Sequence, residues 1–189
     1  MKQKPIFKNK HLNNCAFYNG SMIARKYGFK LSPDFIYIIE AIKVEGYWSY
    51  KNFTIAIQNK NLPFLKRMEK IVRDLGIKSS KRILLKIKPN EDFNKEDVTL
   101  SNESVLNFHI EKSPFDESKK VVTNLPYKKE YNIKISIKNK TYNVLVKESK
   151  EEFEIVSELK AWAYLDLRFP TSRLLKFLSE YLKDNREVR

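Results

Sequence analysis

The chain contains few glycines, a single cysteine and no long apolar segment. Its 189 residues include 4 glycines, 2 histidines and only Cys15 as a thiol. One cysteine excludes an internal disulfide and provides no thiolate cluster for zinc. No apolar run approaches the roughly 18 residues that a membrane-spanning helix needs. The N-terminus also lacks the apolar core of a signal peptide. We therefore expect an intracellular, cytoplasmic protein with no membrane association.

Positive charge is abundant. The chain has 37 lysines and arginines against 23 acids, a net charge of +14 and an isoelectric point near 9.7. A hydrophobic content of 42% excludes a disordered polyelectrolyte and predicts a folded core. A basic folded chain is typical of proteins that bind a polyanion, and nucleic acid is favoured over a membrane surface.

The charge is distributed unevenly along the chain. Residues 1–30 contain lysines and arginines but no acid, whereas residues 91–118 are predominantly acidic. The flanking stretches, 31–90 and 119–147, are basic again. We interpret residues 1–30 as a basic N-terminal arm and residues 31–189 as one domain interrupted by an acidic excursion at 91–118. A short helix within residues 21–27 is the alternative to an irregular arm, and the arm is favoured.

A helix that is apolar on two sides is predicted over residues 33–45. Ser32 provides an N-cap and Pro33 occupies the first helical position. Core positions follow the helical i, i+3, i+4, i+7 spacing. They are Phe35, Ile38, Ile39 and Ile42. A second apolar stripe consists of Ile36, Tyr37, Ala41 and Val44. Because both stripes must be covered, the helix is expected to be central or to lie at an oligomer interface.

The end of this helix carries an acid followed by a glycine, Glu45-Gly46. Glycine is the usual residue just past a helix end. A carboxylate there opposes the negative end of the helix dipole, which generally costs a few tenths of a kcal/mol. Glu45 is thus either a solvated helix-end acid or a metal-binding residue.

Alternating apolar residues predict several strands beyond Gly46. Two short strands occupy 47–59, with a turn near Lys51-Asn52, and a helix runs from Asn61 to Gly76. Further strands are expected at 81–88 and 104–111, and a hairpin turns at Asn139-Lys140. Residues 161–169 fit either a helix or a strand, and the period of two favours a strand. An amphipathic helix follows Pro170.

The order of these elements and the helix sequence resemble the LAGLIDADG homing endonucleases, especially their archaeal and intein-type members. The segment IYIIEAIKVEG, residues 36–46, lines up with the family's usual Ala-Tyr-Ile-Ile-Gly-Ala-Ile-Leu-Gly-Asp-Gly. The resemblance covers residues 31–88 well and the rest of the chain loosely. It implies an α+β class with an αββαββα fold whose sheet forms a saddle over DNA. If residues 161–169 were instead a decayed second motif, Arg168 would occupy its acid position.

The resemblance also implies roles for individual residues. Glu45, with Gly46, would stand at the metal position and supply Mg²⁺ to the scissile phosphate, and Gln58 would orient water. With one motif, the chain is expected to form a homodimer on double-stranded DNA, without a small-molecule substrate. The interface would comprise Ile36, Tyr37, Glu40, Ala41 and Val44. Glu40 stands where the family has a small residue, and Lys43 can pair with it. The DNA-facing residues would be Arg82, Lys86, Lys88, Lys134, Lys138 and Arg168.

Two functions follow from this reading. One is an enzyme, a Mg²⁺-dependent, site-specific double-strand DNA endonuclease. The other is a catalytically inactive relative that binds nucleic acid as a DNA-binding regulator or RNA-splicing cofactor. The sequence leaves both open.

Overall fold

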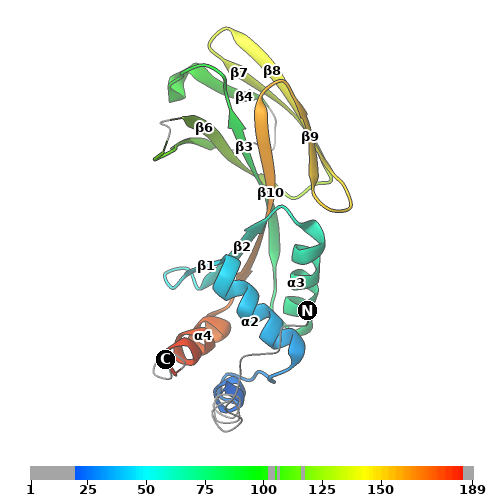
Figure 1. Ribbon diagram of the computed structural model, residues 1–189, viewed down its shortest axis with the longest axis vertical. Helices are drawn as coiled ribbons and strands as arrows, with labels where there is room; N and C mark the ends of the chain where they lie inside the picture. Colours follow the sequence, from blue (N-terminus) through cyan, green and yellow to red (C-terminus); the bar gives the residue numbers. More distant parts are fainter. Residues whose placement is uncertain (1–19, 102–104, 106, 116–117, 185–189) are drawn as a thin grey trace, which may run out of the picture. The chain divides into compact units, whose positions relative to one another are not determined.

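The computed structural model describes residues 20–101, 105, 107–115 and 118–184, and it has a mixed α+β architecture (Figure 1). A helix over residues 20–26 precedes the remaining elements. These are α2 (Pro33–Glu45), β1 (Gly46–Ser49), β2 (Thr54–Asn59), α3 (Leu62–Asp74), β3 (Ser80–Lys88), a 3₁₀ turn (Lys95–Asp97), β4 (Val98–Ser101), β5 (Phe108–Lys112), β6 (Lys119–Pro126), β7 (Glu130–Ile137), β8 (Lys140–Glu148), β9 (Phe153–Ser157), β10 (Lys160–Pro170) and α4 (Ser172–Asp184).

The chain divides into two compact units. Unit 1 comprises Met1–Ile55, Ile71–Lys78 and Phe169–Arg189, and unit 2 comprises Ala56–Lys70 and Ser79–Arg168. Six strands are hydrogen-bonded in the order β1-β2-β10-β3-β6-β5, and a second sheet has the order β4-β7-β8-β9. In unit 2 the pairings of β10 with β3, β3 with β6, and β7 with both its neighbours are antiparallel.

Helix α2 begins and ends as its sequence predicts. The Ser32 hydroxyl accepts a hydrogen bond from the Phe35 N–H at 3.1 Å, and Pro33 is the first helical residue. The four predicted core residues, Phe35, Ile38, Ile39 and Ile42, are all buried. Strand β1 starts at Gly46 directly after the helix, so no loop separates Glu45 from the sheet.

Residue 46 must be a glycine because the helix end leaves no room for a side chain there. Its φ of −86° is accessible to every residue, and its N–H donates to the Ile42 carbonyl. A Cβ built on Gly46 would lie 2.4 Å from that same carbonyl oxygen and 2.9 Å from the Ile42 Cα. Backbone atoms cannot move aside as a side chain can. The helix-to-strand junction is therefore closed to any residue with a side chain.

The N-terminal region is more structured than an irregular arm. Residues 20–26 form a helix, which corrects the arm interpretation for that stretch. Its Ala24 is fully buried, and Phe29 stacks on Phe35 with ring centroids 4.8 Å apart. The ring centroids of Phe177 in α4 and Phe35 in α2 are 5.1 Å apart, so an aromatic cluster joins these two helices to the segment that follows the helix at 20–26. Residues 1–19 of the proposed arm lie outside the described residues.

The predicted strands are largely confirmed. The β7–β8 hairpin buries Tyr131, Ile133, Ile135 and Ile137 as expected. Its turn is one residue earlier than predicted: Lys138 and Asn139 form it, and Lys138 has a φ of +52°. The register of the two strands explains this shift. Ile137 pairs with Lys140, so only the two residues between them remain for the turn. The strand expected at 104–111 is observed as β5, Phe108–Lys112; the prediction's start at Ser104 lies outside the described residues.

Residues 160–170 form a strand, which settles the choice between helix and strand. Ala163, Leu165, Leu167 and Phe169 are buried, as the period of two predicted. Strand β10 lies beside β3 over nine paired residues (Figure 1). None of the helices in the described part of the chain has the length and apolar character to cross a membrane.

We predict that Gly46→Ala destabilises the protein by about 1–3 kcal/mol, the usual cost of forcing extra volume into a packed site. Urea or thermal unfolding measures the change. Gly76→Asn serves as the control, because Gly76 has a φ of +72°, which asparagine tolerates, and nothing lies within 4 Å of its Cβ position. Equal losses for the two variants would contradict the steric explanation of Gly46.

Candidate nucleic-acid interface

The β10–β3 pairing creates one polar face on the six-stranded sheet within unit 2. Residues directly opposite each other in antiparallel strands point to the same face. Arg168 is opposite Ser80, Asp166 is opposite Arg82, Trp162 is opposite Lys86, and Lys160 is opposite Lys88. The face that carries these even-numbered residues of β3 and β10 is called the basic face below.

The other face of the same strands is apolar. It carries the alternate residues, which are buried: Ile83, Leu85, Ile87, Ala163, Leu165 and Leu167. One side of these two strands thus belongs to the core; on the other side Arg82 and Lys160 are exposed, whereas Leu84 and Asp166 are buried. The basic face is consequently held by a hydrophobic core directly beneath it.

Strands β6 and β5 extend the basic face. Val122 of β6 is opposite Lys86 on one side and His109 on the other, and Lys120 is opposite Glu111. The Lys120 ammonium lies 5.7 Å from the centre of the Trp162 ring, within reach of a cation–π interaction. Half-buried Trp162 therefore sits among lysines from neighbouring strands.

Glu111 offsets part of the positive charge. Its carboxylate accepts a hydrogen bond from Lys86 Nζ at 2.7 Å. This bond lowers the pKa of the Glu111 carboxyl below its usual value, although partial burial opposes the shift. The charge of Lys86 is therefore partly neutralised by Glu111, whereas the side chains of Arg82 and Lys160 are exposed.

The sequence-predicted DNA-facing residues fall into two groups. Arg82, Lys86, Lys88 and Arg168 lie together on the basic face. Lys134 lies on β7, in the other sheet. Lys138 lies in the β7–β8 turn, and its ammonium donates to the Asp92 carbonyl at 2.8 Å. The interpretation of Lys138 as a strand residue is therefore wrong.

Sequence reasoning missed several residues on this face, namely Trp162, Lys160, Lys120 and His109. The alternation of side chains along residues 160–168 already predicted that Trp162 and Arg168 lie on the same face of the strand. The pairing of β5 with β6 was not visible in the sequence, because the signal for β5 was weak. His109 and Lys120 could therefore not be assigned to this surface in advance.

Asp166 is the unusual member of the basic face. Its side chain is 0% exposed, and its Oδ2 accepts a hydrogen bond from Arg168 Nε at 2.7 Å. Its Oδ1 is also buried and has no hydrogen-bond partner among the described residues. An unsatisfied buried acceptor is costly, so Asp166 calls for a specific explanation.

The residues at the proposed metal position are exposed. Glu45 is the last residue of α2, in unit 1, and Gln58 is an exposed residue of β2, in unit 2. The described residues contain no group of three or more His, Cys, Asp or Glu side chains that could hold a metal ion. One copy of Glu45 provides two carboxylate oxygens, so further ligands for Mg²⁺ would have to come from water, phosphate or a second protein copy.

The second apolar stripe of α2 is left uncovered in the single chain. Val44 is 78% exposed and Ile36 is 40% exposed, while Tyr37 and Ala41 are half-buried. Glu40 lies on the exposed side and pairs with Lys43 at 3.0 Å, as the sequence predicted. Exposed Tyr47 of β1 follows shortly after Val44 along the chain and adds further apolar surface in unit 1.

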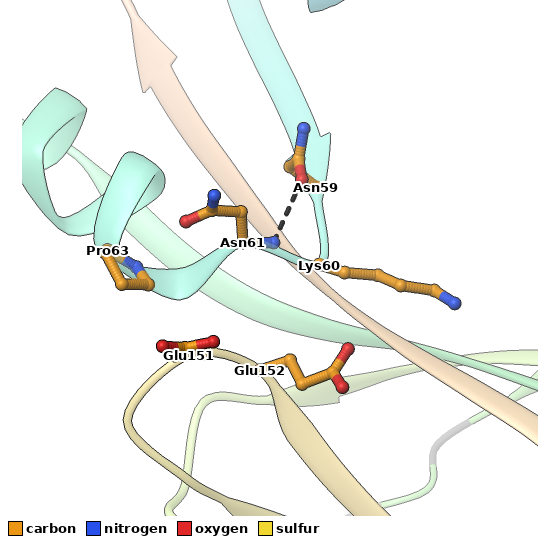
Figure 2. Close-up of a pocket in the computed structure, with 6 residues that line it drawn as sticks. All are labelled: Asn59, Lys60, Asn61, Pro63, Glu151 and Glu152. Atoms are coloured by element: carbon orange, nitrogen blue, oxygen red, sulfur yellow. Dashed lines mark hydrogen bonds between the residues drawn. The ribbon is translucent and has the colours of Figure 1, made fainter.

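A separate pocket of about 530 Å³ opens at the start of α3 (Figure 2). Its asparagines are engaged locally: Asn59 accepts from the Asn61 N–H, and Asn61 accepts from the Phe64 N–H. Glu151 and Glu152 line the opposite side, with Lys60 as the cation. Two carboxylates would repel a phosphate backbone, so this pocket is not part of the candidate interface.

No family model, no curated protein and no solved structure matches this chain.

We expect the double variant Lys88→Met and Lys160→Met to reduce the salt dependence of nucleic-acid binding. Each lost phosphate contact lowers the slope of log K against log salt by about 0.9. Titration of a fluorescent DNA duplex at several salt concentrations measures this slope. Lys70→Met is the control, because it removes one charge from an exposed position of α3 outside the basic face. A slope that is unchanged in the double variant would contradict the assignment of this face.

Proposed function

We propose that this chain is a double-stranded DNA-binding protein of the LAGLIDADG homing-endonuclease type. The observation that carries the proposal is the basic face of β3 and β10, which places arginines, lysines and an aromatic ring on one side of a sheet with a packed core behind it. Positive side chains on a strand surface suit contact with a duplex, where lysines neutralise phosphates and arginines can also read bases.

The order of the elements supports this proposal. Read along the chain, α2, β1, β2, α3, β3, β10 and α4 have the order αββαββα. Strands β4 to β9 are inserted between the last two strands, β3 and β10, which nonetheless pair with each other. The acidic excursion at 91–118 falls within this insertion. The chain would thus contain the saddle-shaped sheet and, within the insertion, an additional four-stranded sheet.

The exposed stripe of α2 supports pairing of two copies. Ile36, Ala41 and Val44 would be covered by the same residues of a second chain, as in an isologous interface. Glu40 lies between Ile36 and Val44 on the same exposed face of α2, so a second copy would cover it together with Lys43, with which it already pairs. A two-fold protein would then favour a pseudo-palindromic DNA site.

Glu45 is the residue through which cleavage would occur. It lies at the helix end next to the paired stripe, where two copies would bring two carboxylates together with the DNA. Carboxylate oxygens are preferred Mg²⁺ ligands, and the ion would supply an activated water and stabilise the leaving oxygen. The resemblance assigns the water-orienting role to Gln58, which is exposed on β2.

The alternative is a DNA-binding regulator or RNA-splicing cofactor on the same scaffold. It is supported by the finding that the described residues of one copy contain no group of three or more His, Cys, Asp or Glu side chains that could hold a metal ion. If two copies do not pair, binding through the basic face would persist without a metal site. The two functions therefore differ in the role of Glu45 and not in the role of the sheet.

We predict that Glu45→Gln abolishes Mg²⁺-dependent cleavage and leaves duplex binding intact. The loss of cleavage activity should be larger than the roughly 10- to 100-fold loss that follows when a group outside the direct metal ligands is removed. Cleavage of a mixed duplex library, read by sequencing of new ends, measures the effect. Glu154→Gln, at an exposed position of β9, is the control and should cleave normally. Specific binding by the wild-type protein without any cleavage would support the regulator instead.

We predict that Val44→Glu converts a dimer into a monomer, because it would bury two charges at the paired helices. Light scattering at several protein concentrations measures the mass. The fold should survive, since Val44 is exposed in one copy. Phe115→Glu makes the same chemical change at another exposed apolar residue and should leave the mass unchanged. A wild-type protein that is monomeric at every concentration would rule out the paired site.

A further inference from the structure

The buried carboxylate of Asp166 lies between two arginines on the basic face. Arg168 contacts its Oδ2 through Nε at 2.7 Å, and Arg82 is the residue directly across from it on β3. Facing residues in antiparallel strands have Cβ atoms about 4.5–5.5 Å apart, well within the length of an arginine. No other described residue satisfies the second oxygen, Oδ1.

The bond to Nε determines which edge of Arg168 remains free. A guanidinium has five N–H donors in a planar fork, and Nε provides one of them. With Nε held at Asp166, the two terminal nitrogens still carry four donors. The Arg168 side chain is 36% exposed, so these donors are accessible from the basic face. The planar group is thereby fixed in orientation before any partner binds.

The basic face also separates arginines from lysines. Arg82 and Arg168 lie at one end of the β3–β10 pair, and Lys86, Lys88 and Lys160 lie at the other. Between them is the pair of Tyr164 and Leu84. Four residues along a strand, from Arg82 to Lys86, correspond to roughly 13 Å. One end of the face thus offers lysine ammoniums, of which Lys86 is bonded to Glu111, and the other offers the guanidinium of Arg168 held by Asp166.

We propose that Asp166 is a positioning residue that makes Arg168, with Arg82 beside it, a reader of a guanine edge in the DNA major groove. The inference rests on the proposed DNA binding and specifies what this end of the face recognises. Guanine presents two acceptors, O6 and N7, that match two parallel donors of an arginine. A phosphate contact needs no such prior orientation, and flexible lysines suffice for it.

The buried position of Asp166 fits this role. A carboxylate that is fully enclosed cannot itself reach a base, so it acts through Arg168. Removal of one partner of a buried pair is generally costly because it leaves an uncompensated charge. Arg82 is able to swing onto the free Oδ1 when DNA covers the face, which would satisfy the remaining acceptor and order a second arginine. Both arginines would then be oriented by one carboxylate.

The test is selection of bound duplexes from a random library by the full-length protein, with sequencing of the selected pool. The wild-type protein should prefer guanine at one position of each half-site. Asp166→Leu and Arg168→Lys should each weaken that preference by roughly 10- to 100-fold, the worth of one bidentate contact. Asp166→Asn should retain most of it, because its carbonyl oxygen can still accept from Nε. Lys70→Met should match the wild type.

The salt slope provides the second readout. Asp166→Leu removes no positive charge, so its slope should equal that of the wild type. A weaker affinity that is uniform across sequences, with a reduced salt slope for the charge-removing variant Arg168→Met, would identify a phosphate contact and overturn the guanine assignment. If Asp166→Leu folds and keeps the wild-type base preference, Asp166 has only a structural role and the proposed positioning role is refuted. If Asp166→Leu does not fold, Arg168→Lys carries the test, because lysine keeps the charge and loses the fork.

The free protein offers an independent check. The Nε–H of Arg168 should give an NMR signal that is protected from exchange in the wild-type protein and loses this protection in Asp166→Leu. Salt-dependent binding by the wild type without any guanine preference would refute the inference and leave the proposed function standing. Absence of salt-dependent binding would refute both.

Discussion

The antiparallel pairing of β3 with β10 is the constraint on which the candidate interface depends. It joins residues 80–88 to residues 160–168, two stretches separated by the whole inserted segment. Because a strand alternates its side chains with a period of two, a slip of one residue would exchange the two faces. Leu165 and Leu167 would then face water and Arg168 would be buried. The apolar core on one side therefore fixes the position of every cation on the other.

The same alternation explains what the sequence was able to predict. Helix α2 and strand β7 follow simple periodic patterns, and their buried residues were identified correctly; in β3 the same pattern identified Ile83, Leu85 and Ile87 but not the buried Leu84. The residue before Gly46 was recognised as a helix end. These features are local, since each depends on residues within a few positions of one another. The mixed α+β class follows from them directly.

The features that the sequence could not predict depend on long-range pairing. The neighbour of β3 in the sheet is β10 on one side and β6 on the other, and neither is adjacent to it in the chain. Lys120 and His109 join the basic face only through this order. The sequence pattern assigned Asp166 to the solvent-facing side of its strand. Its burial results from neighbouring residues and could not be read from that pattern. The helix at residues 20–26 was weighed only as the less favoured alternative, because a short segment becomes stable through packing of Ala24 and Phe29, which local propensity does not report.

Binding and cleavage would place different demands on this fold. The basic face is complete within one chain: its core, its cations and its oriented Arg168 all belong to unit 2. Glu45 belongs to unit 1 and is the last residue of α2, the helix whose residues Ile36 and Val44 a single copy leaves exposed. A copy that never pairs could still hold DNA through its sheet, but it could not assemble two carboxylates around a phosphate. The stripe of Ile36, Ala41 and Val44 is thus the physical link between a binding protein and an enzyme. Under the proposed function, coverage of this stripe by a second copy, more than the chemistry of Glu45 itself, would distinguish cleavage from binding alone.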